Sequence, residues 1–88
     1  MAYITKNFST FSISYVDVKI TEDNFHKYGY DVEGKCGYVG IHTNELTYEL
    51  SLQLRSDDEN QVRDALDTII RYRMFWANML SSMLQQEA

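Results

Sequence analysis

The chain has 88 residues, of which 44% are hydrophobic, and 8 Lys+Arg against 13 Asp+Glu give a formal net charge of −5. This length allows one domain, and the apolar content excludes a disordered chain. The single Cys excludes an internal disulfide, and no apolar run reaches the roughly 18 residues that a membrane span needs. The acidic balance argues against a general binder of nucleic-acid phosphates. Since the N-terminus lacks the pattern of a signal peptide, we expect a cytoplasmic protein.

Before Ser56 the hydrophobic residues recur with a period of two, which predicts a four-stranded antiparallel meander. The strands are expected over about residues 8–20, 25–32, 36–42 and 46–54. The segment from Leu46 to Leu54 has the clearest pattern, because every even position is apolar and every odd position is polar.

Turn chemistry sets the expected register of these strands. A hairpin centred on Gly34 places Tyr30 opposite Tyr38, and a second hairpin centred on Asn44 places Tyr38 opposite Leu50. Both hairpins then bring the even-numbered residues onto one apolar face, and this agreement favours the meander. The odd-numbered face is expected to be solvent-like, with a small apolar centre of Val39 and Ile41 that offers a modest second docking surface.

The first predicted strand changes phase in its middle. Phe11, Ile13 and Tyr15 alternate on odd numbers, whereas Val16 begins an alternation on even numbers. A β-bulge or bend there would bring both sets onto one face. Without it, the odd-numbered residues lie on the opposite face.

A long helix is predicted after the strands, over about residues 57–85. Ser56 followed by Glu59 has the spacing of a capping box, and acidic residues in the first turn suit the helix dipole. A helix of about 28 residues spans about 42 Å, whereas a nine-residue strand spans about 30 Å. The expected fold is therefore α+β, in the order ββββα, with the helix lying across the even-numbered face and overhanging the sheet. The expected core stripe of the helix is Val62, Ala65, Leu66, Ile69, Arg73, Trp76, Ala77, Leu80 and Met83 or Leu84.

The C-terminal half of this helix is apolar on nearly all sides between Met74 and Leu80. A helix of that kind is usually buried on more than one side, and one small sheet covers one side only. The sequence therefore predicts an interface for a second copy of the chain or for another protein, although Phe8, Phe25 or the N-terminal segment would be an internal alternative. The predicted interface residues are Tyr72, Arg73, Phe75, Trp76, Met79 and Met83.

Arg73 falls on the apolar stripe of the helix, where a charge needs a partner or a path to solvent along its own stem. In a dimer, Asp67 or Glu59 of the other chain is the expected partner. Replacing Arg73 with leucine should then leave the fold intact and weaken assembly.

No group of residues in the sequence predicts catalysis, a cofactor or a metal. His26 and His42 would be cross-strand neighbours able to bind zinc or nickel, but Cys36 lies about 20 Å away along the strand, so two partly buried imidazoles are the favoured interpretation. Cys36 itself is expected to fill the core. The acidic residues are interpreted as a solvated, dipole-matched face, with mimicry of nucleic acid as the alternative; they are Asp57, Asp58, Glu59, Asp64 and Asp67.

The functional expectation is a non-enzymatic protein-binding module that acts through the aromatic and methionine-rich helix surface. In size and composition the chain also resembles small phage and mobile-element inhibitors of host machinery, including anti-CRISPR proteins. One alternative is an oligomer that binds a small ligand or nucleotide in a pocket around Tyr28, Tyr30, Tyr48 and Arg73. A second alternative is a structural or chaperone subunit of a larger assembly. Tyrosines on a sheet could also stack on RNA bases, but the helix is expected to cover them.

Overall fold

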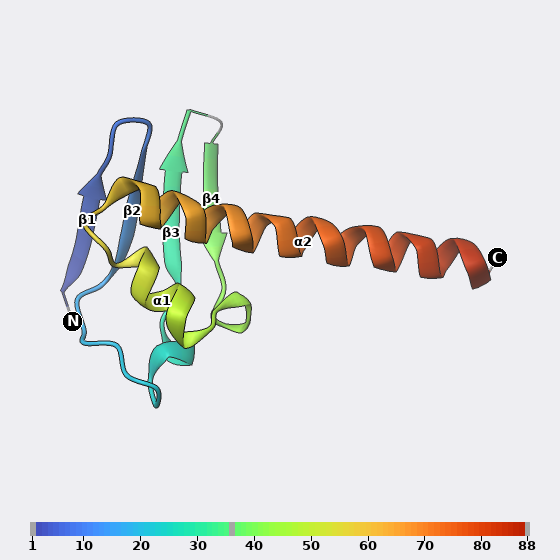
Figure 1. Ribbon diagram of the computed structural model, residues 1–88, viewed down its shortest axis with the longest axis horizontal. Helices are drawn as coiled ribbons and strands as arrows, with labels where there is room; N and C mark the ends of the chain where they lie inside the picture. The colour runs from blue at the N-terminus through green and yellow to red at the C-terminus, as the bar shows by residue number, and fades with distance from the viewer. Residues whose placement is uncertain (1, 36, 88) are drawn as a thin grey trace.

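The computed structural model describes residues 2–35 and 37–87, and for residues 76–87 it describes the backbone alone. Four strands form one antiparallel sheet in chain order, and the long helix that follows them confirms the expected α+β arrangement (Figure 1). The strands are β1 (Tyr3–Asn7), β2 (Phe11–Val16), β3 (Tyr30–Gly34) and β4 (Gly37–Ile41). The helices are η1 (Phe25–Lys27), η2 (Thr43–Glu45), α1 (Tyr48–Leu54) and α2 (Glu59–Glu87), the first two being single 3₁₀ turns.

The N-terminal part of the sheet differs from the single strand predicted over residues 8–20. It is the hairpin of β1 and β2, closed by a hydrogen bond of 2.8 Å from the Phe8 amide to the Phe11 carbonyl. The chain leaves the sheet after Val16, so the even-numbered alternation that begins there belongs to a connecting segment and needs no bulge. Ile13 and Tyr15 are buried under the helices.

The register of β3 and β4 also differs from the prediction. Gly34 pairs with Gly37, so a tight turn follows Gly34 instead of being centred on it, and Gly37 has the positive φ of 118° that glycine tolerates. Tyr30 therefore lies opposite Ile41 and not opposite Tyr38. The shift is odd in residue number, so it reverses the faces of β4: Ile41 is buried on the helix side, whereas Tyr38 is 66% exposed on the other side.

The predicted strand over residues 25–32 begins later than expected. Residues 25–27 form η1, and β3 starts at Tyr30. His26 and His42 are consequently not a cross-strand pair: His26 packs edge-on against Phe25, and His42 precedes η2. Both imidazoles are exposed, which corrects the expectation of partly buried neighbours.

The segment predicted as the fourth strand, residues 46–54, is mainly the helix α1, and the turn expected at Asn44 is the 3₁₀ turn η2. Thr47 caps α1 by accepting a hydrogen bond of 3.1 Å from the Leu50 amide. Leu50 and Leu54 of this short helix have i, i+4 spacing and pack in or against the core, as does Leu46, which lies between η2 and α1. The fourth strand of the sheet is instead β1.

The helix α2 begins two residues later than the predicted capping box implies. Asp58 is its N-terminal cap, since its Oδ1 accepts a hydrogen bond of 2.9 Å from the Asn60 amide. Ser56 instead accepts from the Asp58 amide, and the Glu59 carboxylate accepts from the hydroxyl and amide of Ser9. Val62, Ala65 and Ile69 are buried, which confirms the predicted core stripe over this part of α2.

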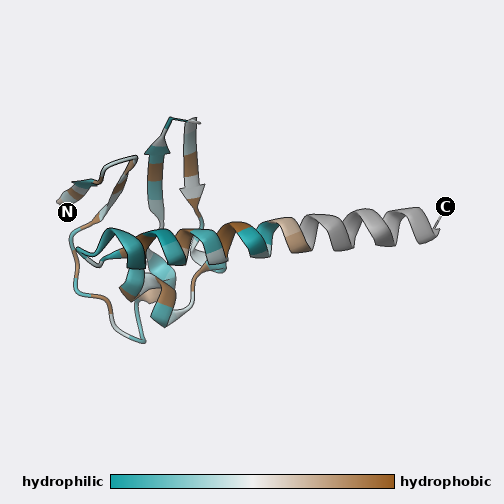
Figure 2. Ribbon diagram, turned by 45° about the horizontal axis from the view of Figure 1, so that its top comes forward, coloured by the Kyte–Doolittle hydropathy of each residue, from teal (hydrophilic) through white to brown (hydrophobic). Residues whose placement is uncertain are grey.

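α2 runs across the strands and continues well beyond β4, and α1 lies beside it on the same face of the sheet (Figure 1). In Figure 2, apolar residues recur along the part of α2 that crosses the sheet, and polar and apolar bands alternate on β3. The hairpin ends of the strands project past α2 in both views. The helices therefore cover one part of the sheet face, and the overhang predicted from helix length is present.

A polar network lies inside the core between β3 and the end of α1. The hydroxyls of Tyr30 and Ser51 are 2.6 Å apart, and Arg55 Nε donates to the Tyr30 hydroxyl at 2.8 Å. The Arg55 guanidinium also donates to the Val18 carbonyl and lies 4.5 Å from the ring centroid of Tyr15. Burying a charge in this way is tolerated because hydrogen bonds and aromatic faces surround most of it.

Candidate functional site

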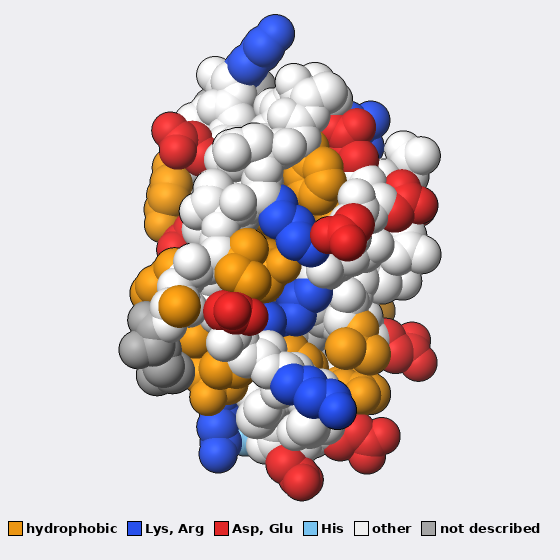
Figure 3. Space-filling model, turned by 90° about the vertical axis from the view of Figure 1, so that its left-hand side faces the viewer, with side chains coloured by type: hydrophobic (Ala, Val, Ile, Leu, Met, Phe, Trp, Pro, Cys, Tyr) orange, Lys and Arg blue, Asp and Glu red, His pale blue; other side chains and the backbone are white. Residues whose placement is uncertain are grey.

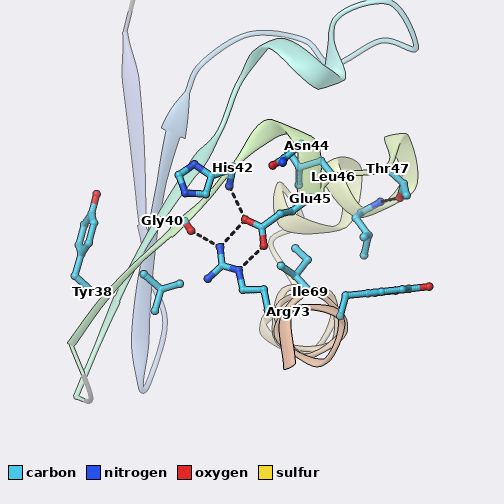
Figure 4. Close-up of a pocket in the computed structure, with 12 residues that line it drawn as sticks. Tyr38, Gly40, His42, Asn44, Glu45, Leu46, Thr47, Ile69 and Arg73 are labelled. Carbon is cyan, nitrogen blue, oxygen red and sulfur yellow. Dashed lines mark hydrogen bonds and ion pairs between the residues drawn. The ribbon is translucent and has the colours of Figure 1, made fainter. Parts of the chain in front are cut away.

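A groove of about 1010 Å³ lies where β4, η2, the start of α1 and α2 meet. Its walls are mainly apolar, and Arg73 and Glu45 lie at its centre (Figure 4). It is lined by Tyr38, Val39, Gly40, His42, Asn44, Glu45, Leu46, Thr47, Leu50, Ile69, Tyr72 and Arg73.

Arg73 forms an ion pair with a carboxylate of its own chain. Its guanidinium forms a two-pronged ion pair with Glu45: Nε donates to Oε2, and Nη2 donates to Oε1 at 2.6 Å. Nη2 also donates to the backbone carbonyl of Gly40 on β4. Figure 4 shows Arg73 between these two groups. The expectation that Asp67 or Glu59 of a second chain would neutralise Arg73 is therefore corrected, because η2 brings Glu45 to the same place.

Glu45 is held by its own turn as well as by Arg73. Its Oε1 accepts a hydrogen bond of 3.0 Å from the His42 amide, which completes a capping box around η2. The hydrogen bonds from Arg73 lower the pKa of Glu45 below its ordinary value; burial opposes this shift, and the His42 amide adds to it. Arg73 correspondingly has a raised pKa. Glu45 and Arg73 thus tie η2 and α2 to the edge of β4.

This pair predicts an acid-dependent loss of stability. Because the pKa of Glu45 is lower in the folded state, its stabilisation is present above the ordinary carboxylate pKa and is lost as the pH falls through the folded-state value. We expect Glu45→Gln to lower the free energy of unfolding by about 1 to 2 kcal/mol at neutral pH. The difference from the wild type should shrink between about pH 5 and pH 3. Urea unfolding at a series of pH values measures both effects.

The matched control is Asp64→Asn, which removes one negative charge from the exposed side of α2. It should keep the pH profile of the wild type. A constant difference between Glu45→Gln and the wild type down to about pH 3 would contradict a stabilising role for the ionised carboxylate.

The predicted partner surface on α2 can be followed as far as Phe75. Where α2 leaves the sheet, large apolar side chains are exposed on several sides of the helix: Ile70 (43%), Tyr72 (61%), Met74 (62%) and Phe75 (55%). We call these four residues the α2 surface. The side chains of Trp76, Met79 and Met83, which complete the predicted interface, lie outside the described residues, as does Cys36.

The predicted acidic surface is largely engaged in contacts within the chain. Lys6 is 2.7 Å from Asp57, Arg71 is 3.1 Å from Asp67, and Glu59 accepts from Ser9. These contacts lower the pKa values of Asp57 and Glu59. Asp58 caps α2, and Asp64 is exposed on its side. On the face shown in Figure 3, basic and acidic side chains lie next to each other, so no area of a single sign forms there.

Of the tyrosines expected to line a ligand pocket with Arg73, none lines this groove: Tyr30 is buried against Ser51, and Tyr48 packs on Phe25. The groove residues that sequence reasoning missed are chiefly Glu45, Gly40 and Leu46. A signal for Glu45 was present, since it lies three residues after His42 at the spacing of a capping box. Nothing local marks Gly40, because its role depends on which strand forms the sheet edge.

Among the described residues, no three His, Cys, Asp or Glu side chains lie together as metal ligands would. None of the helices, over the same residues, combines the length and apolar composition of a membrane-spanning segment. Comparison of the chain with protein-family models, with curated proteins and with solved structures finds no match.

Proposed function

We propose that the protein is a non-enzymatic binding module that docks another protein chain on the α2 surface. The observation that carries the proposal is the exposure of large apolar side chains where α2 passes the sheet. Isolated exposed apolar residues are common, but four within six consecutive residues of one helix form a patch of the kind found at interfaces. Tyr, Met and Phe are also enriched at the centres of such interfaces.

The composition of the remaining overhang supports the same function. Residues 76–84 read Trp-Ala-Asn-Met-Leu-Ser-Ser-Met-Leu, so the chain continues with large apolar residues and without a charge. A solvated helix needs polar residues over most of its circumference. A partner that covers this helix would remove that apolar surface from water at about 25 cal/mol per Å².

A ligand-binding function has one observation in its favour, the groove beside β4. Its only described Arg or Lys is Arg73, and the Glu45 carboxylate already neutralises that charge. An anionic ligand such as a nucleotide would have to displace this carboxylate, which makes protein binding the stronger proposal. A protein that binds in this way could inhibit a host complex or serve as a subunit of a larger assembly.

The test is a pair of charge substitutions on the α2 surface, Ile70→Glu with Met74→Glu. These residues are one turn apart and exposed, so the variant should fold and should lose bound protein by at least about tenfold. The measurement is quantitative capture of partners by tagged wild type and variant, with self-association followed by sedimentation. The control, Asn60→Glu with Gln61→Glu, adds the same charge on exposed polar positions of α2 and should bind as the wild type does. Equal binding by all three proteins would contradict the proposal.

A further inference from the structure

We propose that the occupant of this surface is a second copy of the chain, joined edge to edge through β4. In this arrangement two β4 strands pair antiparallel about a two-fold axis at Val39, and the two sheets become one sheet of eight strands. The part of each α2 beyond its own sheet then crosses the sheet of the other copy. The inference rests on the proposed function and names its partner.

The outer edge of β4 pairs with no further strand among the described residues, and Arg73 contacts it at Gly40. The sheet order leaves β4 with one neighbour, and the pairing of Gly34 with Gly37 across a two-residue turn makes Val32–Val39 the next hydrogen-bonded pair. The backbone groups of Tyr38 and Gly40 must then point away from β3. The hydrogen bond from Arg73 to the Gly40 carbonyl agrees with this orientation.

This edge is complementary to itself. With the axis at Val39, Tyr38 of each copy lies opposite Gly40 of the other, and the two residues can exchange both backbone hydrogen bonds. The Gly40 carbonyl has a second lone pair, so it can accept from Tyr38 while it keeps Arg73. Exposed strand edges that offer such groups are the usual sites of strand addition.

The helices leave part of the sheet face uncovered. The hairpin ends of the strands project beyond α2 in Figures 1 and 2. Val39 lies on the helix side of the sheet opposite Val32, yet its exposure is 36%, and Phe11 on the same face is only partly buried. An apolar strip of this sheet therefore lacks the second layer that a sheet face ordinarily packs against.

The length and direction of α2 fit the same arrangement. Its 29 residues span about 43 Å, whereas four strands are about 19 Å wide. α2 begins over β1 and β2, crosses all four strands and leaves the sheet at β4 (Figure 1). The remaining length of about 24 Å is enough to cross four more strands. The overhang and the outer edge of β4 thus lie on the same side of the molecule.

The β4 edge, the uncovered part of the sheet face and the length of α2 favour a second copy of the chain over an unrelated protein as the binding partner. Rotation by 180° about an axis normal to the sheet at Val39 keeps both helices on one face and reverses the direction of the second helix. The overhang of each copy then lies beside the other α2 and over the hairpin half of the other sheet. One symmetric contact thus pairs both β4 edges and covers both overhangs, as isologous dimers do.

The test compares two tyrosines that occupy opposite edges of the sheet. Tyr38→Pro removes an amide that points outward from β4 and leaves the backbone hydrogen bonds to β3 in place, although the side-chain hydrogen bond to Asp31 is lost. Tyr3→Pro likewise removes an outward-pointing amide on β1. The hydrogen bonds from Phe8 to Phe11 and from Asp17 to Ala2 show that the even-numbered residues of this hairpin strand make the backbone hydrogen bonds to β2. By sedimentation at about 50 µM we expect the wild type and Tyr3→Pro to be dimers, and Tyr38→Pro to associate at least about 30-fold more weakly. A monomeric wild type, or equal association of all three proteins, would overturn the proposal.

A cross-link tests the register even if Tyr38→Pro fails to fold. In a Cys36→Ser background, Val39→Cys should form a disulfide-linked dimer under mild oxidation, because facing residues at a two-fold axis have Cα atoms about 4.5 Å apart. Thr5→Cys, on the opposite edge, should form no disulfide-linked dimer under the same conditions. Absence of the Val39→Cys dimer, or equal cross-linking at both positions, contradicts the pairing. If these results contradict the pairing while another protein binds the α2 surface, the self-pairing fails and the proposed function stands.

Discussion

Replacing Ile69 with alanine should lower the free energy of unfolding by about 3 to 4 kcal/mol, the largest effect that we expect of a single truncation in α2. Ile69 is 1% exposed and lies in the core cluster with Ile41 and Leu46. Removing its outer carbons leaves a cavity that the sheet cannot close, because β4 is held in its register by β3. For a chain of 88 residues the melting temperature should fall by about 12 to 25 °C.

The control for this prediction is the next residue of the same helix. Ile70 is 43% exposed, so Ile70→Ala changes helix propensity equally but removes little buried contact. We expect a loss of no more than about 0.5 to 1 kcal/mol, measured by urea unfolding at low protein concentration so that association contributes little. Similar losses at both positions would show that α2 does not pack against the sheet through Ile69.

Tyr30→Phe should be the second most damaging substitution, with a loss of about 2 to 3 kcal/mol. The change keeps the ring and its contact with Tyr15 but removes the hydroxyl that joins Ser51 to Arg55. Arg55 Nη2 is already buried without a hydrogen-bond partner, so the loss at Nε leaves a second unpaired donor on the same cation. Buried charged groups lose more than neutral ones when a partner is removed.

A double-mutant cycle separates this explanation from a simple packing defect. Arg55→Met removes the charge, so Tyr30→Phe in that background should cost about 1 kcal/mol or less. Tyr72→Phe removes a hydroxyl from an exposed ring and should be close to neutral. Equal costs of Tyr30→Phe with and without Arg55 would contradict the network.

Most of α2 and the approximate positions of β2 and β4 could be predicted from local pattern. Val62, Ala65 and Ile69 are spaced for one face of a helix, and no proline interrupts the 29 residues that follow Asp58. This pattern predicts the packed face because the part of α2 that crosses the sheet buries one side of the helix. The overhang also followed from length alone, since residue number sets the span of a helix and of a strand.

The candidate site was less predictable because it joins segments that are distant in sequence. The helix pattern identifies Arg73 as a charge that needs a partner, but the partner Glu45 lies 28 residues earlier in the chain and is brought to Arg73 by η2. The helix pattern predicts the interface residues, and of these Tyr72 and Phe75 are exposed on α2. Gly40 accepts the hydrogen bond from Arg73 because β4 lies at the edge of the sheet. The order of the strands depends on the whole chain, so no local pattern predicts this contact.

What the sequence by itself determined is therefore the class of fold, the extent of α2 and its core stripe. Tertiary structure decided the secondary structure of residues 46–54. Their alternation of apolar and polar residues suits a strand, but the spacing of Leu46, Leu50 and Leu54 suits a helix equally well. Leu, Glu and Gln favour helices, and as α1 this segment places Leu54 in the core and Ser51 against Tyr30. The N-terminus supplies the fourth strand. A pattern of period two contains i, i+4 pairs, and only the packing of the rest of the chain chooses between them.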